Sequence, residues 1–192
     1  MNQKDSISIK RTYSLLKEEL FSLLSESSFE KLTLTEICNA SMIPRSTFYR
    51  YFEDKYDLLR YLLQSMAEEM RLTEDVVYFK SKESLQEFLM ILIQHFAAHR
   101  EQYQRIYLAN KDGVLMDIIR KDLKLILTEK IAKAQENGVK LKISLPIFAT
   151  LLTDFYFSIV TCYLGLEEQI SIEEFVESVY LFSDKDFFEK EC

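Results

Sequence analysis

The chain has 192 residues, of which 48% are hydrophobic and 29% are charged, and its net charge is −7. Three glycines and two prolines are too few for the turns of a β-rich chain, so the composition favours long helices. Three scattered cysteines exclude a disulfide framework and are typical of a reducing compartment. Neither a signal peptide nor an apolar run of the roughly 18 residues that cross a membrane is evident, so we expect a cytoplasmic protein without membrane contact.

The negative charge is not spread evenly along the chain. Residues 1–64 carry nine basic and nine acidic side chains, whereas residues 65–192 carry fifteen basic and twenty-two acidic ones. The acidic excess therefore lies outside the N-terminal third. The negative net charge of the chain therefore does not exclude a nucleic-acid partner for residues 1–64. Because this segment is neutral, its affinity for such a partner must come from individually positioned contacts.

The first helix is expected from about Ile9 to Ser25, where apolar residues recur at helical spacing. A polar loop follows, and we expect its Phe29 and Leu32 to point into the core. The stretch 33–55 then predicts two short helices joined by a tight turn. Thr33 and Glu36 form a capping box at the start of the first of these helices.

Pro44 marks the start of the second short helix, because a proline costs no hydrogen bond in a first turn. Phe48 and Phe52 are four residues apart, so they share a face and should anchor this helix to the core. Ser46, Thr47 and Arg50 point the other way. The layout is that of a helix-turn-helix, whose second helix enters the DNA major groove.

The side chains of this second helix suit DNA. Arginine can donate two parallel hydrogen bonds to guanine, and hydroxyls or a threonine methyl can approach base edges. Tyrosine hydroxyls and Lys55 suit phosphate oxygens. The other interpretation is a helical hairpin that contacts protein and no nucleic acid, which the neutral charge of residues 1–64 favours.

The segment I-P-R-S-T-F-Y-R-Y-F-E-D-K-Y-D-L-L, residues 43–59, resembles the signature of the TetR family of transcriptional regulators. The resemblance covers roughly residues 9–62 and departs at Met42, where the family usually has glycine, and at Pro44, where it usually has serine. A left-handed backbone at Met42 would cost about 1 kcal/mol. The resemblance implies an all-α fold of about nine helices, with a three-helix DNA-binding domain followed by a helical regulatory domain. From the residues and the resemblance together, the expected DNA contacts are Thr35, Arg45, Ser46, Thr47, Tyr49, Arg50, Tyr51 and Lys55.

Apolar periodicity predicts further helices beyond Lys55, separated by a loop at 73–84. Gly138 is expected to cap one helix, and Ser144 with Pro146 to begin another. Ser171 and Glu174 form a second capping box. The expected helices are about 55 to the low seventies, 84–100, 101–110, 114–137, 144–164 and 171–183, followed by a charged tail from Asp184.

Residues 145–183 are unusually apolar, and 148–164 are hydrophobic nearly all round. One face can pack within the subunit and the other against a second copy, forming a four-helix interface that places two reading helices on a palindromic operator. The alternative is that both faces are buried within one subunit.

The high aromatic content, 14 Phe and 11 Tyr, predicts either a filled core or a pocket for a small hydrophobic or aromatic effector. His95 and His99 are four apart, but no third ligand completes a metal site. No catalytic motif or phosphate-binding glycine loop is evident, so we expect neither an enzyme nor a cofactor. The candidate pocket residues are Phe88, Phe96, Tyr107, Phe148, Phe155 and Tyr156.

These observations predict residues 1–54 as a helix-turn-helix DNA-binding domain and residues 55–192 as a ligand-binding and dimerisation domain. The expected function is a homodimeric, sequence-specific DNA-binding transcriptional regulator, a repressor released by a small-molecule effector. The rival is a helical interaction module that uses the same scaffold without binding DNA.

Overall fold

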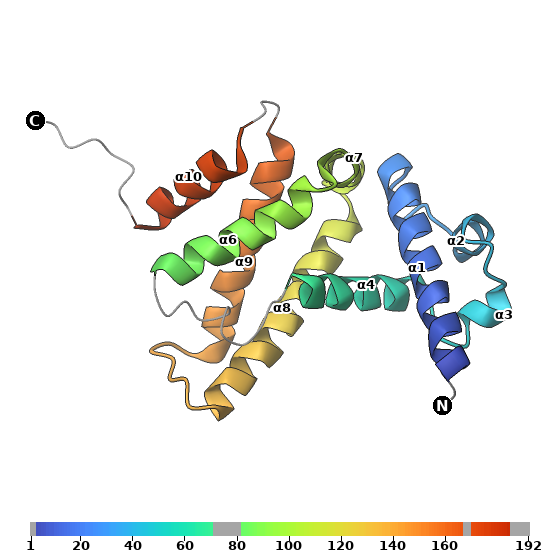
Figure 1. The fold of residues 1–192 in the computed structure, drawn as a ribbon, viewed down its shortest axis with the longest axis horizontal. Coiled ribbons are helices and arrows are strands. Elements are labelled where there is room, and N and C mark those ends of the chain that lie inside the picture. The colour runs from blue at the N-terminus through green and yellow to red at the C-terminus, as the bar shows by residue number, and fades with distance from the viewer. Residues whose placement is uncertain (1–2, 71–81, 167–169, 185–192) are drawn as a thin grey trace, which may run out of the picture. The chain divides into compact units, whose positions relative to one another are not determined.

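A computed structural model describes residues 3–70, 82–166 and 170–184, and these residues contain nine helices and no strand (Figure 1). The predicted all-α fold is therefore confirmed. Residues 73–81 of the expected loop lie outside the described residues, as does the tail beyond Asp184, whereas residues 82–84 are helical and not part of a loop. The helices are α1 (Gln3–Glu26), α2 (Leu34–Ala40), α3 (Arg45–Phe48), α4 (Lys55–Glu69), α6 (Lys82–Ala97), α7 (Arg100–Asn110), α8 (Val114–Glu136), α9 (Leu145–Gly165) and α10 (Ile172–Asp184).

The chain forms two compact units, each with its own core. The N-terminal unit comprises Met1–Ser65 together with Glu101–Ile119, and the C-terminal unit comprises Met66–Arg100 and Arg120–Cys192. Part of α7 and the first turns of α8 thus belong to the same unit as α1–α3. The assignment of distinct functions to residues 1–54 and 55–192 stays a prediction.

The core of the N-terminal unit is built from the inward faces of its helices. α1 contributes Leu16, Leu20 and Leu24, which recur every four residues and are at most 1% exposed. α2 packs against α1, and α3 packs against α2 (Figure 1). The remaining core residues are Phe29, Leu32, Ile37, Cys38, Phe48, Phe52, Leu58, Leu59, Leu62, Ile106 and Leu115. The prediction that Phe29 and Leu32 are buried is confirmed.

The first helix is longer than expected. It begins at Gln3, not near Ile9, although the polar N-terminal residues give no apolar periodicity. Helix propensity continues a helix outward from a packed centre at low cost, because each added residue gains one backbone hydrogen bond. The expectation of a helix starting at Ile9 was therefore wrong.

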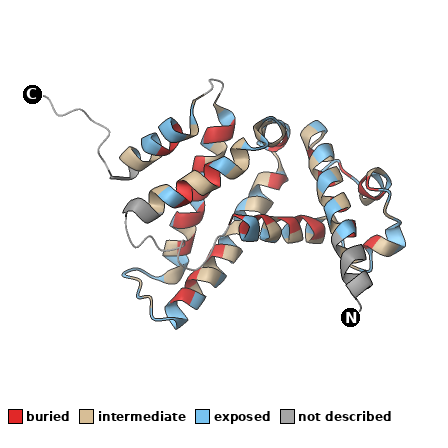
Figure 2. Ribbon diagram, viewed as in Figure 1, coloured by how far each residue is buried: buried red, intermediate tan, exposed pale blue. Residues whose placement is uncertain are grey.

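In the C-terminal unit, α6 packs against α9 and α10. Buried positions recur at helical spacing along α6 and α9 (Figure 2). At the end of α8, Gly138 has φ +96° and the N–H of Val139 donates to the Ala134 carbonyl at 3.0 Å, so the predicted glycine cap is confirmed. The Ser171 hydroxyl accepts the Glu174 N–H at 3.1 Å at the start of α10.

α9 corrects one expectation from the sequence. By length and composition it is apolar enough to cross a membrane, with Asp154 as its one charged residue, so the statement that no such run exists was wrong. Threonines, a serine and Asp154 interrupt its apolar residues, so the apolar run is not continuous in the sequence. Asp154 lies 3.7 Å from the Arg120 guanidinium, and that guanidinium lies over the Phe157 ring at 4.4 Å.

Candidate nucleic-acid interface

The turn between α2 and α3 is built on a strained residue. The capping box predicted at Thr33 and Glu36 is present, and it fixes the start of α2. After α2 the chain reverses at Met42, whose φ of +53° lies in the left-handed region that favours glycine. The Ile43 N–H then donates to the Cys38 carbonyl at 3.0 Å. The turn thus keeps its left-handed geometry although it lacks the glycine.

α3 has a single regular turn, and backbone hydrogen bonds continue the helical path beyond it. Pro44 (φ −57°) precedes it, and the carbonyl of Pro44 accepts the N–H groups of Thr47 and Phe48. Beyond the helix, the N–H groups of Tyr51 and Phe52 both donate to the Phe48 carbonyl, at 2.9 and 3.0 Å. The helical path therefore continues to Phe52.

The phenylalanine pair anchors this segment as predicted. Phe48 is fully buried and Phe52 is 5% exposed, with ring centroids 5.5 Å apart. Tyr13 of α1 and Tyr61 of α4 complete the cluster, at 5.5 and 5.6 Å from the Phe52 ring. Ring contacts, tilted with Tyr13 and edge to face with Tyr61, hold the segment to both neighbouring helices.

Most of the predicted DNA contacts lie on the opposite, exposed side. Arg45, Ser46, Tyr49 and Arg50 are exposed, and Thr47 is half-buried. Thr35 is exposed in the first turn of α2. The hydroxyl and guanidinium groups of α3 and the residues just after it thus form a polar surface that solvent can reach, and Thr35 is exposed on α2.

Both exposed arginines of this surface lie against a tyrosine side chain. The Arg45 guanidinium donates to the Tyr49 hydroxyl at 3.5 Å and lies 6.0 Å from the centre of its ring. That hydrogen bond raises the pKa of Arg45. The Arg50 guanidinium lies 5.9 Å from the centre of the Tyr51 ring. Stacking on tyrosine restricts each long side chain before any ligand arrives.

Tyr51 is less accessible than its neighbours. Its ring is half-buried and meets the Tyr13 ring edge to face, with centroids 5.6 Å apart. Burial, with a smaller contribution from Tyr51, raises the pKa of Tyr13. Tyr51 therefore joins the aromatic cluster as well as bordering the polar surface.

Lys55 differs from the other predicted contacts, because carbonyl oxygens surround its ammonium group. Nζ donates to the carbonyls of Phe29 at 2.8 Å, Leu32 at 2.7 Å and Glu30 at 3.3 Å. It also lies 4.6 Å from the centre of the Phe29 ring. Burial lowers the pKa of Lys55, while the carboxylates of Glu30, Asp54 and Glu36 act in the opposite direction.

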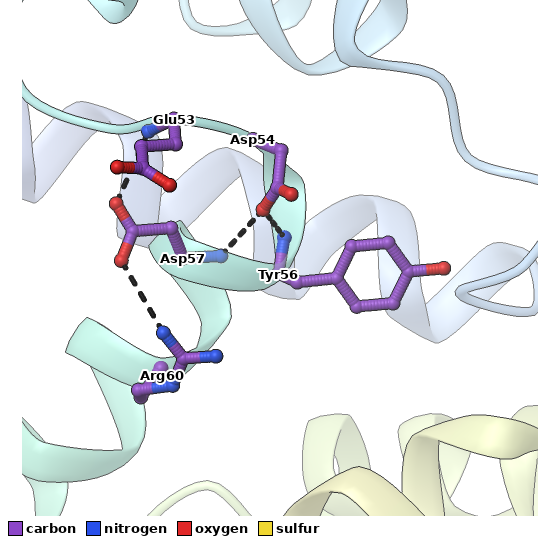
Figure 3. Close-up of polar contacts among 5 residues, drawn as sticks. All are labelled: Glu53, Asp54, Tyr56, Asp57 and Arg60. Carbon is purple, nitrogen blue, oxygen red and sulfur yellow. Dashed lines mark hydrogen bonds and ion pairs between the residues drawn. The ribbon is translucent and has the colours of Figure 1, made fainter.

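A carboxylate pair that the sequence analysis did not single out fixes the start of α4 (Figure 3). Asp54 Oδ1 accepts the N–H groups of Tyr56 and Asp57, both at 2.8 Å. Asp57 Oδ2 accepts the Glu53 N–H at 3.1 Å, and Asp57 Oδ1 lies 3.6 Å from the Arg60 guanidinium. Asp54 followed three residues later by Asp57 is the sequence signal of such a cap. The cap holds Lys55 in the first turn of α4.

Asn110 is a second residue that sequence reasoning missed. It is 1% exposed at the end of α7, and its amide accepts the Phe29 N–H at 2.8 Å and donates to the carbonyls of Leu24 at 3.1 Å and Ile106 at 2.9 Å. No local pattern predicts this role, because two partners lie far away in the chain.

Glu30 connects the same loop to the start of α8. Its carboxylate accepts the Val114 N–H, and this hydrogen bond is the largest of the effects that lower the pKa of Glu30. A Cβ at Gly113 would lie only 2.7 Å from Glu30 Oε1, so glycine leaves the space that the carboxylate occupies.

The candidate pocket residues do not all fall in one unit. Phe88 and Tyr156 are buried in the C-terminal unit, with ring centroids 5.0 Å apart, and burial raises the pKa of Tyr156. Phe96, Phe148 and Phe155 are half-buried in the same unit. Tyr107 belongs to the N-terminal unit, so the candidate pocket combined residues that belong to different units.

The described residues hold no group of three or more His, Cys, Asp and Glu side chains able to bind a metal. His95 lies edge to face with the adjacent Phe96 ring at 5.4 Å, and His99 is exposed. Their spacing alone gives no support for a metal centre.

Known proteins resemble this chain in the region of α1–α4. Residues 17–62 match the family described as bacterial regulatory proteins, tetR family. A curated relative, the HTH-type dhaKLM operon transcriptional activator DhaS of Lactococcus lactis subsp. lactis, is 22% identical over 112 residues, which are 58% of this chain and 56% of that protein. The match therefore spans little more than half the length of this relative.

Solved structures share the fold along nearly the whole chain. A protein from Syntrophomonas wolfei assigned to the TetR family superposes with a TM-score of 0.61 at 21% identity, covering 93% of this chain and 95% of that one. A TetR transcriptional regulator from Streptococcus agalactiae gives 0.56 at 17% identity, covering 93% and 96%. Thermus thermophilus FadR, a TetR-family repressor in complex with lauroyl-CoA, gives 0.51 at 21% identity, covering 95% and 96%.

Proposed function

We propose that this chain, which belongs to the TetR family of DNA-binding transcriptional regulators, binds a palindromic DNA operator as a homodimer in the cytoplasm. Regulators of this family are transcription factors and not enzymes, in agreement with the absence of catalytic motifs from the sequence. The observation that carries the proposal is the polar surface of α3, which stands opposite the buried pair Phe48 and Phe52.

The contacts with DNA follow from the chemistry of that surface. Arg45, in the first turn of α3, is placed to donate to guanine O6 and N7, while Ser46 and Thr47 suit base edges. Tyr49, Tyr51 and Thr35 suit phosphate oxygens through their hydroxyls, and Arg50 through its guanidinium group. With a neutral N-terminal segment, these positioned contacts must supply much of the affinity.

Dimerisation is supported by the exposed apolar face of α9. Ile147 and Leu151 are 55% and 60% exposed, and Ser158 and Cys162 continue the same face. Phe182 of α10 is 67% exposed. Two large apolar side chains one turn apart, followed on the same face by small ones, favour a second copy as partner, and that copy would also cover the apolar length of α9.

For the direction of regulation, we propose a repressor that a small hydrophobic or aromatic molecule releases from DNA. The half-buried rings of Phe96, Phe148 and Phe155, near the Phe88–Tyr156 pair in sequence, are the candidate contacts in the C-terminal unit. FadR is named a repressor and was solved with an acyl-CoA, whereas DhaS is named an activator. A reporter gene behind the operator, measured with and without the regulator, decides between the two directions.

The function as a whole is tested by selection of random DNA fragments with the purified full-length chain. We expect enrichment of a two-fold symmetric motif whose half-sites lie about one helical turn, or a multiple of it, apart. Failure to enrich any motif, with a folded protein, would contradict DNA recognition and favour the helical interaction module.

A further inference from the structure

The inference concerns Lys55, the first residue of α4, and it rests on the proposed DNA-binding function. An ammonium group has three N–H donors and no acceptor. The carbonyls of Phe29, Glu30 and Leu32 supply three acceptors within 3.3 Å of Nζ. These three contacts therefore account for the whole donor capacity of the side chain.

The segment that Lys55 holds, residues 29–32, leads directly into the reading helices. Thr33, the next residue, is the N-cap of α2, and its capping box with Glu36 starts that helix. On the other side of the segment, Asn110 accepts the Phe29 N–H at 2.8 Å. Lys55 and Asn110 thus fix the backbone of the 29–32 segment through its carbonyl and N–H groups respectively.

The charges around Lys55 also argue against a phosphate ligand. The carboxylates of Glu30, Asp54 and Glu36 each raise the pKa of this ammonium against the effect of burial, so a phosphate arriving there would meet their negative charge. A phosphate would also have to displace a carbonyl from Nζ. By contrast, Arg45 and Arg50 are exposed on the polar surface of α3.

We propose that Lys55 is a positioning residue, whose ammonium group orders the 29–32 segment and thereby sets the placement of α2 and α3, and that it does not bind a DNA phosphate. Replacement of Lys55 should weaken DNA binding, because α2 and α3 would no longer be held in position by the 29–32 segment. The number of ions released on binding should stay the same, because no phosphate contact is lost.

The test is Lys55→Met in the full-length chain, which removes the charge and keeps a stem of similar length. The DNA is the fragment obtained in the selection, titrated at several salt concentrations. We expect at least about a tenfold loss of affinity with an unchanged slope of log K against log salt, and a urea midpoint lower by roughly 1 M. Arg50→Met is the matched control: its slope should fall by about 0.9 for each lost phosphate contact, with an unchanged urea midpoint.

The variant Lys55→Arg keeps the positive charge of the side chain but changes the geometry of its hydrogen-bond donors. A guanidinium group can serve a phosphate, but its planar donors do not fit three carbonyls that converge on one nitrogen. A positioning role predicts that Lys55→Arg fails to restore either DNA affinity or the urea midpoint. A phosphate role predicts near wild-type affinity for Lys55→Arg and a slope reduced by about 0.9 per contact for Lys55→Met.

The unfolding measurement keeps the inference independent of DNA recognition. If the wild-type protein selects no DNA, the proposed function fails, while a lowered urea midpoint of Lys55→Met still supports the ordering of the 29–32 segment. An unchanged urea midpoint for Lys55→Met overturns the inference, whatever the DNA result. If Lys55→Met does not fold at all, the urea midpoint and salt slope of Lys55→Arg decide the question.

Discussion

The side-chain amide of Asn110 accepts the backbone N–H of Phe29 at 2.8 Å across 81 residues of sequence. The same amide donates to the carbonyls of Leu24 and Ile106. The end of α7 is thereby joined to the segment that precedes the reading helices, within the N-terminal unit. The α7–α8 turn thus belongs to the same compact unit as α1–α3.

Asn110→Ala should destabilise the protein. The substitution leaves the buried Phe29 N–H without this partner, which costs about 1–3 kcal/mol for each orphaned buried group. Urea unfolding of the full-length chain should show a lower midpoint. Asn39→Ala, at an exposed position of α2, is the control and should stay close to wild type. Equal midpoints for Asn110→Ala and wild type would show that the amide contributes no net stability.

Met42→Gly should stabilise the protein. At φ +53° a side chain strains the backbone, and the Met42 side chain is 84% exposed, so its removal forfeits little burial. The expected gain is about 1 kcal/mol. Met42→Ala keeps the Cβ and should give no such gain. If both variants unfold at the same urea concentration, the strain at Met42 is not the cause.

Glu36→Gln isolates the charge of the capping box. Hydrogen bonds from Thr33 lower the pKa of Glu36 below its ordinary 4.5. A depressed carboxyl pKa stabilises the folded state above the unfolded value, and this stabilisation is lost as the pH falls through the lower folded value. The difference in unfolding free energy between wild type and Glu36→Gln should therefore be constant near neutral pH and shrink below about pH 4.5. A difference that does not change with pH would refute a contribution from the ionised group.

Arg45→Lys should relax sequence choice. Lysine keeps the charge but loses the planar pair of donors that matches guanine, so discrimination at one base step should fall by about 1–3 kcal/mol. Binding to DNA fragments that differ at single positions of the operator measures the change. Arg60→Lys, on α4 beside Asp57, should leave every preference intact. Unaltered preferences for Arg45→Lys would remove Arg45 from the base contacts.

Leu151→Arg should disrupt the proposed dimer. Leu151 is 60% exposed within one subunit, so an arginine is compatible with the folded chain. In a dimer interface the unpaired charge should raise the dissociation constant by at least about 30-fold. Sedimentation over a range of concentrations measures the shift. Leu125→Arg, on α8 at a site that is 51% exposed, tests whether any exposed leucine gives the same result.

Short-range sequence patterns were sufficient to predict the local features of α2 and α3. Thr33 with Glu36, Pro44, and the pair Phe48 and Phe52 act over three or four residues, so helical geometry alone fixes their roles. The family signature in residues 43–59 rests on the same short-range pattern. The all-α fold followed from composition and apolar spacing for a similar reason.

Features that depend on partners far away in the sequence became visible only in the folded chain. Lys55 was predicted to contact a DNA phosphate, and the fold places the carbonyls of Phe29, Glu30 and Leu32 around its ammonium group, which no local pattern predicts. Tyr107 fell in a different unit from the other candidate pocket residues. A periodic pattern states which face of a helix is apolar, but only packing states which atoms meet that face. An ammonium or an amide is bound by whichever donors and acceptors the folded chain brings within about 3 Å.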